Sequence, residues 1–156
     1  MADDDIYGSK ARYERFLASL SSRTSKVPLS QGRGRSAKYY CKNPENIKYF
    51  RKLESIFKAR DVSFVRRIRI MQSLMLLSYV LECDFSKATR DDFDRAVGHM
   101  HEVYASPKSK VTFIQDIKYL WRFLFPDMDE KGRPDDTIVP YAVRHLSASI
   151  EKAGKR

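Results

Sequence analysis

Residues 63–81 read SFVRRIRIMQSLMLLSYVL and decide the fold. Ser63 is a residue type that caps helix N-termini well. The apolar residues that follow it are Val65, Ile68, Met71, Leu74, Met75, Leu77 and Leu81. They are too many for a single stripe, so neighbouring elements must cover most of this helix. Its most apolar part, residues 70–81, is interrupted by Gln72 and Ser73 and is too short to span a bilayer. The stretch therefore predicts a buried central helix.

The first turns of this helix are basic. At 100° per residue, Arg66, Arg69 and Ser73 fall on one side, and Arg67 lies a quarter turn away. Arginine side chains suit phosphates and base edges, and Gln72 and Ser73 suit a major groove. The alternative is a solvated helix end that has no ligand. Because three guanidiniums cluster on an otherwise apolar helix, we favour contact with DNA.

Two helices are predicted before the central one. Apolar spacing predicts the first over residues 6–20, although its docking partner is not evident. Asn43 followed by Pro44 is a good N-cap with proline at the first helical position, and it opens the second. The apolar stripe of that helix is Ile47, Phe50, Leu53 and Phe57.

Three helices are predicted after the central one. Thr89 and Asp92 have the form of a capping box, and that helix ends near residue 104. Ser106 and Pro107 open the next, which Pro126 stops. A polar loop over residues 127–136 precedes a short closing helix from about residue 141 to 153. No run alternates apolar and polar residues between turns, so no strand is predicted. We expect an all-α fold: a compact bundle of four to five helices, with the weak first helix outside the bundle in a basic N-terminal arm.

The helix after Ser106 separates its two faces cleanly. Its apolar face is Phe113, Ile114, Ile117, Leu120, Trp121 and Leu124, so we expect Trp121 in the core and not stacked on a base. Its candidate DNA-binding residues are Lys108, Lys110, Thr112, Gln115, Lys118 and Arg122. Such a face is often only solubilising, and that alternative stays open.

A third basic segment lies between residues 23 and 42, where Ser and Gly alternate with Arg and Lys. This composition disfavours regular structure, so we predict a flexible arm whose Arg33, Arg35 and Lys38 contact DNA. The predicted division is therefore residues 1–42 for the weak helix and arm, 43–126 for the helical core, and 127–156 for the loop and closing helix. The net charge of +10 and the pI near 9.7 also favour a polyanionic partner, and DNA or RNA is the commonest. We expect no membrane binding, because the cations do not gather on one amphipathic helix.

The sequence does not contain the residue patterns that metal binding, secretion or catalysis would require. Cys41 and Cys83 match no metal-ligand spacing and fit a reducing cytosol, and the acidic N-terminus does not look like a signal peptide. His99 and His101 point to opposite sides of a helix, whereas zinc pairs on helices use four-residue spacing. No glycine-rich phosphate loop, nucleophile elbow or suggestive carboxylate pair is found. We expect no metal, no cofactor, no small-molecule substrate and no catalysis.

Four segments carry a resemblance: ATRDDF at residues 88–93, KYLWRFLFP at 118–126, DEKGRPD at 129–135 and PYAVRHL at 140–146. With the order of the helices, they resemble the N-terminal core-binding (SAM-like) domain of tyrosine recombinases, the phage integrase and Xer class. The likeness is greatest to archaeal integrase-like proteins and covers about residues 13–156. The helical pattern is only moderately specific to this family, whereas the sequence of residues 129–145 is more specific to it.

The resemblance implies one half of a clamp around double-stranded DNA, in which the second and fourth core helices face the major groove. These are the helices that carry the basic residues named above. It also implies a cytoplasmic, nucleoid-associated protein that acts in DNA integration beside other integrase protomers. The family's catalytic Arg, Lys, His-x-x-Arg and nucleophilic Tyr belong to a separate C-terminal domain. Leu146, Ser147 and Ala148 follow His145, and no tyrosine comes later, so we expect no strand cleavage by this chain.

Two alternatives remain open at this stage. The bundle could bind a full-length integrase, with its cations mostly solubilising. It could also bind RNA, because arginine-rich segments can become ordered on RNA.

Overall fold

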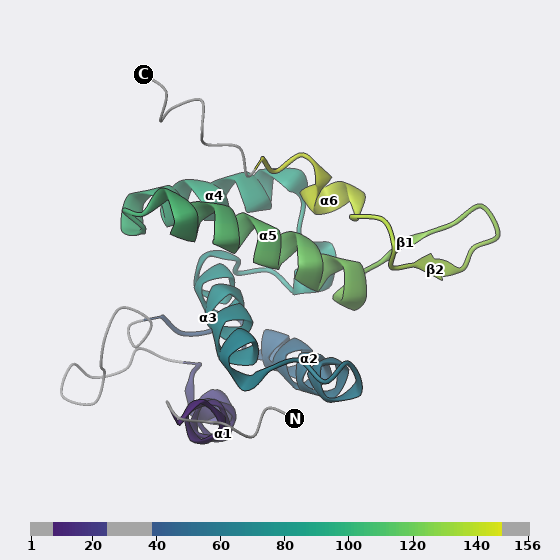
Figure 1. Ribbon diagram of the computed structural model, residues 1–156. Helices are drawn as coiled ribbons and strands as arrows, with labels where there is room; N and C mark the ends of the chain where they lie inside the picture. The colour runs from purple at the N-terminus through teal and green to yellow at the C-terminus, as the bar shows by residue number, and fades with distance from the viewer. Residues whose placement is uncertain (1–7, 25–38, 148–156) are drawn as a thin grey trace. The chain divides into compact units, whose positions relative to one another are not determined.

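The computed structural model describes residues 8–24 and 39–147. The described part is all-α, as predicted. Its helices are α1 (Ser9–Ser19), α2 (Ile47–Ala59), α3 (Phe64–Val80), α4 (Arg90–Val103), α5 (Pro107–Leu124) and α6 (Tyr141–Arg144), with short 3₁₀ turns between them. Two strands, β1 (Asp127–Met128) and β2 (Pro134–Asp135), pair antiparallel in a small hairpin (Figure 1). No described helix has the length and apolar character that a membrane span requires.

The helix starts are set by the predicted caps. The Ser63 hydroxyl accepts a hydrogen bond from the Arg66 amide, and Ser106 caps α5 with Pro107 at its first position. Thr89 and Asp92 form the reciprocal capping box that opens α4. Asn43 caps a 3₁₀ turn, Pro44–Asn46, which leads into α2. Local sequence therefore determines where these helices begin.

The chain divides into two compact units, Met1–Asp84 and Phe85–Arg156. This grouping differs from the predicted division, which kept residues 43–126 in one domain. The composition of the chain does not change at the loop after α3, so nothing in the sequence marked this boundary. Each unit has its own buried aromatic residues.

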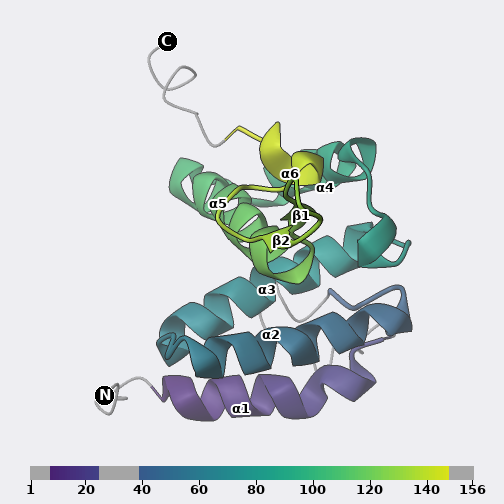
Figure 2. The ribbon, with the colours of Figure 1, turned by 90° about the vertical axis from the view of Figure 1, so that its right-hand side faces the viewer.

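In the N-terminal unit, α1 and α2 both pack against α3 (Figure 2). The Tyr13 ring lies 5.9 Å from the ring of Phe64, and the Phe16 ring lies 6.4 Å from that of Phe50, measured between centroids. The central position of α3 within this unit is confirmed, and the partner of α1 is α3. The Arg23 guanidinium also donates to the Tyr39 carbonyl at 2.8 Å, which joins the two flanks of the predicted arm.

In the C-terminal unit, α4, α5 and α6 pack together, and Trp121 lies at the centre of their aromatic side chains. Its ring is 4.8 Å from Phe93, 5.2 Å from Phe125 and 5.6 Å from Phe85. Trp121 is only 2% exposed, so the prediction that it belongs to the core is confirmed. The pairing of α4 with α5 is therefore built on one aromatic cluster.

Two sequence predictions about the end of the chain need correction. The closing helix, predicted to run to about residue 153, ends at Arg144; Leu146 and Ser147 are not helical, and residues 148–153 lie outside the described part. The turn allows Leu146 to be buried, and its amide donates to the Val143 carbonyl. The predicted loop over residues 127–136 contains the β hairpin, which was not predicted because each strand has only two residues.

Two buried groups make the N-terminal unit sensitive to high pH. Burial raises the pKa of the Cys41 thiol from 9.0 to about 11, and burial together with nearby Glu54 raises that of the Tyr13 hydroxyl from 10.0 to about 12. Both pKa values are higher in the folded state, so their contribution to stability is complete below pH 9 and is lost as the pH rises toward 12. We expect the urea midpoint to fall progressively above pH 9.

The Cys41→Ser variant provides the control, because a serine hydroxyl does not titrate in this range. Its urea midpoint, measured by far-UV circular dichroism, is expected to stay level until about pH 10, where Tyr13 begins to matter. A variant that shows the same onset as the wild type would contradict the role given to Cys41.

Candidate nucleic-acid interface

The first two turns of α3 present a basic surface. Arg66 and Arg69 are exposed, as the helical spacing predicted, and Gln72 is exposed as well. The helix is 17 residues long, so its positive N-terminal end adds to the attraction for anions. We call Val65, Arg66, Arg69 and Gln72 the α3 surface. Val65 is included because 58% of its side chain is exposed, which corrects the prediction that it belongs to the core.

Arg67 is not part of the α3 surface. Its side chain is 7% exposed, and its Nε donates to the Val62 carbonyl at 2.8 Å. The guanidinium carbon lies 4.5 Å from the Phe64 ring centroid and 5.5 Å from that of Tyr13, in the range of cation–π contacts. The predicted contact between Arg67 and DNA is therefore wrong. Helix α1 covers that side of α3, and the Arg67 side chain is buried against it.

Ser73 is also inside the unit. It was predicted to accompany Gln72 at a major groove, but it is 5% exposed. The exposed side of α3 is thus narrower than the spacing of the polar residues suggested, and it is centred on Val65, Arg69 and Gln72.

The C-terminal unit carries a second basic surface along α5. Lys108 and Gln115 are exposed, while Thr112, Lys118 and Arg122 are half-buried. At 100° per residue these five residues lie within about 120° of one another, so the predicted face exists as one strip. We call these five residues the α5 surface.

Lys110 does not belong to the α5 surface. At 100° per residue it lies about 160° from Lys108, on the side of α5 that carries Ile114 and Ile117. It is half-buried near the start of the helix. The sequence prediction grouped it with the other cations by composition, whereas the helical phase separates it from them.

One member of the α5 surface also has a structural contact. The Arg122 Nε donates to the Asp136 carbonyl at 2.8 Å, and its guanidinium lies 5.3 Å from the Phe123 ring centroid. Arg122 therefore holds the loop after β2 against α5. Because its replacement would disturb that loop, Lys108 and Lys118 are the better residues for testing binding.

The predicted arm residues Arg33, Arg35 and Lys38 lie outside the described part of the chain. The candidate DNA-binding residues that the structure does describe lie on α3 and α5, which belong to different units.

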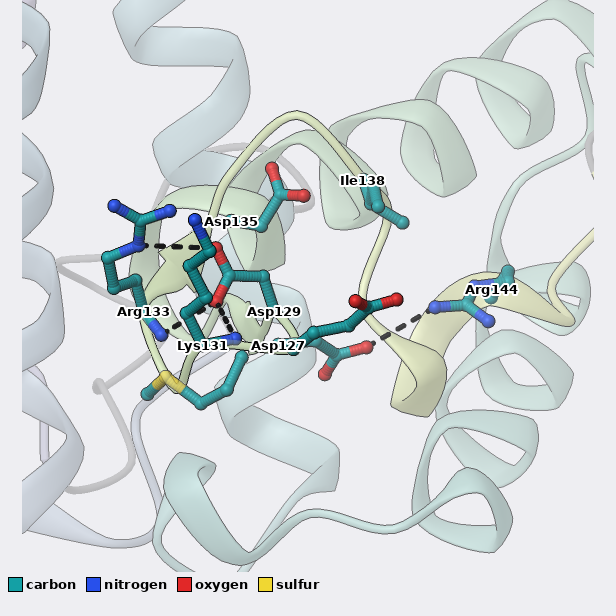
Figure 3. A pocket seen from close by; sticks show the side chains of 9 residues that line it. Asp127, Asp129, Lys131, Arg133, Asp135, Ile138 and Arg144 are labelled. Carbon is teal, nitrogen blue, oxygen red and sulfur yellow. Dashed lines mark hydrogen bonds and ion pairs between the residues drawn. The ribbon is translucent and has the colours of Figure 1, made fainter.

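A pocket of about 510 Å³ lies beside the β hairpin and is lined by both acidic and basic side chains (Figure 3). Its carboxylates are used to shape the loop. Asp129 accepts hydrogen bonds from the amides of Lys131 and Arg133 at 2.8 and 2.9 Å. Asp127 accepts from the Tyr141 amide at 2.9 Å and pairs with Arg144 at 3.3 Å. These contacts hold the hairpin in its shape, so the acidic side chains of the pocket have a structural role.

Arg144 and His145 also have structural partners. The Arg144 Nε donates to the Val139 carbonyl at 3.0 Å, and the His145 Nε2 lies 2.8 Å from Asp94 Oδ1. Arg90 stacks on the Tyr141 ring at 3.5 Å and donates to the Tyr141 carbonyl. These contacts fasten α6 to α4 and to β1.

Within residues 8–24 and 39–147, no group of three His, Cys, Asp or Glu residues is arranged to hold a metal ion. His101 is exposed and His99 is half-buried on α4.

Comparisons with protein-family models, with curated proteins and with solved structures give no match for this chain.

Proposed function

We propose that this chain is a double-stranded DNA-binding module, and that it serves as the core-binding part of a site-specific tyrosine recombinase. The observation that carries DNA binding is the α3 surface, where two exposed arginines and a glutamine stand at the start of a 17-residue helix. An α-helix fits the major groove of B-DNA, and the residues near its N-terminus are those that reach the base edges in helix-turn-helix proteins. The recombinase assignment rests on the sequence resemblance.

The two surfaces have the chemistry that DNA binding needs. Guanidinium and ammonium groups neutralise phosphates and release condensed counterions, which supplies most of the affinity of such complexes. Gln72 on α3 and Gln115 on α5 can pair with adenine, and arginine can pair with guanine. The net charge of +10 speeds the encounter with the polyanion. The chain holds DNA and leaves strand cleavage to the family's catalytic domain.

The proposal is tested by the affinity for a labelled duplex, measured by fluorescence anisotropy at low salt. We expect Arg66→Ala/Arg69→Ala to weaken binding about a hundredfold or more, because hydrogen bonds to charged groups contribute about 1.5–3 kcal/mol each and about 1.4 kcal/mol is tenfold in affinity. Lys108→Ala/Lys118→Ala is expected to weaken it in the same way. If both surfaces hold one duplex, the four-residue variant loses about the sum of the two free energies.

The matched control is Arg51→Ala/Lys52→Ala, which removes the same two charges from the exposed side of α2. We expect a smaller effect from this pair, because it acts only through net charge. Equal losses from all three pairs would show that the α3 and α5 surfaces are not special. Absence of duplex binding by the wild type would contradict the proposal and favour a protein partner, and preference for structured RNA would favour RNA binding.

A further inference from the structure

An apolar side chain stands at the N-terminal end of the α3 surface. Val65 is 58% exposed, although it belongs to a helix that is otherwise largely buried. The other large apolar side chains that the described residues expose to a similar extent are Met128, Ile138 and Tyr141, and all three belong to the C-terminal unit. Val65 therefore leaves two methyl groups in water beside the exposed Arg66 and Arg69.

The neighbours of Val65 on the helix are polar and aligned with it. At 100° per residue, Val65, Arg69 and Gln72 fall within about 60° of one another, and Arg66 lies about a quarter turn to one side. All four are exposed. The stripe along the first turns of α3 thus consists of the isopropyl group of Val65, the guanidinium of Arg69 and the carboxamide of Gln72 in succession.

The stripe matches the major groove of DNA better than other polyanionic or protein surfaces. The groove displays a methyl group, the C5-methyl of thymine, beside the donors and acceptors that arginine and glutamine recognise. The major groove of an RNA helix is too narrow for side chains to read. The net charge of +10 also favours a polyanion over a protein surface of mixed charge. Charge complementarity therefore selects the duplex as the occupant.

We propose that Val65 packs against the C5-methyl group of a thymine in the major groove, while Arg69 and Gln72 pair with neighbouring bases. Val65 is then a determinant of specificity, and the target site contains thymine at a fixed position opposite the start of α3. This inference rests on the proposed function, and it adds a base preference that phosphate contacts alone do not give.

The test compares thymine with deoxyuridine, which lacks only the methyl group. Duplexes that bind best are selected from a random pool with the wild-type chain, and each thymine of the selected site is then replaced by deoxyuridine in turn. At one position we expect the wild type to lose about fourfold in affinity. This factor corresponds to about 0.8 kcal/mol, the usual contribution of one buried methyl or methylene group. The Val65→Ala variant should bind the thymine site more weakly and lose little on the same replacement.

The Met128→Ala variant is the matched control, because it removes another exposed apolar side chain and should retain the full dependence on the methyl group. Tight duplex binding in which wild type and Val65→Ala lose the same factor at every replaced thymine would overturn the inference. Selected sites that hold no fixed thymine would overturn it as well. Failure of the wild type to bind any thymine-containing duplex overturns the proposed function itself, and this outcome is recognised before any deoxyuridine is introduced.

Discussion

The Trp121→Ala variant is expected to lose about 3–5 kcal/mol of the free energy of unfolding, the usual cost of removing a large aromatic side chain from a core. Trp121 is 2% exposed and contacts the rings of Phe85, Phe93 and Phe125. Loss of the indole leaves a cavity at the point where α4 meets α5. Aromatic pairs of this kind also contribute beyond the area that they bury. The C-terminal unit should therefore be strongly destabilised.

The measurement is urea denaturation followed by far-UV circular dichroism, because the variant lacks the chain's single tryptophan. The Met128→Ala variant serves as the control: its side chain is 64% exposed, so its stability should stay within about 0.5 kcal/mol of the wild type. A loss of less than about 1 kcal/mol for Trp121→Ala would contradict the central position of the indole.

The Arg67→Ala variant is expected to lose about 2–4 kcal/mol of stability and little intrinsic affinity for DNA. The side chain donates to the Val62 carbonyl and contacts the rings of Phe64 and Tyr13, so its removal breaks a charged hydrogen bond and opens a gap under α1. The alkyl stem also packs against its neighbours. The effect should appear in the N-terminal unit.

Arg69→Ala is the matched comparison, because it removes the same group from an exposed position two residues away. We expect it to weaken duplex binding and to change the urea midpoint little, the reverse of Arg67→Ala. Both variants are assayed for stability by circular dichroism and for affinity by anisotropy below their unfolding transitions. If Arg67→Ala weakened binding as much as Arg69→Ala while keeping full stability, the buried role of Arg67 would be wrong.

Much of the helical framework could be predicted because its signals are local. The capping residues Ser63, Thr89 and Ser106 lie next to the turns that they start, and the apolar spacing in α5 distinguishes its two faces. Trp121 could likewise be assigned to the core from its place on the apolar stripe. Local chemistry is sufficient for predictions of this kind.

The errors concern which side of a helix is covered. Val65, Arg67 and Ser73 sit within three turns of α3, and their sequence spacing is compatible with several orientations of the exposed side. The docking of α1 decides the orientation, because it buries Arg67 beside Tyr13 and leaves Val65 exposed. Since the partner of α1 depends on contacts distant in sequence, the spacing on α3 alone could not reveal it.

The candidate site was predicted in part for the same reason. Arg66, Arg69, Lys108 and Gln115 are exposed as the sequence indicated. Lys110 and Arg122 show what composition misses: the first falls out of phase with the α5 surface, and the second holds a loop carbonyl. Residue type predicts that a surface is cationic, whereas helical phase and loop packing decide which cations are available.

The central claim, that the basic surfaces hold duplex DNA, is tested most directly by the salt dependence of wild-type binding. The account predicts that log K falls linearly with log salt, with a slope of about −3 or steeper. Each neutralised phosphate contributes about −0.9, Arg66, Lys108 and Lys118 can each neutralise one, and contacts from the predicted arm would add to them. A duplex affinity that does not change with salt, or no duplex binding at low salt, would contradict it.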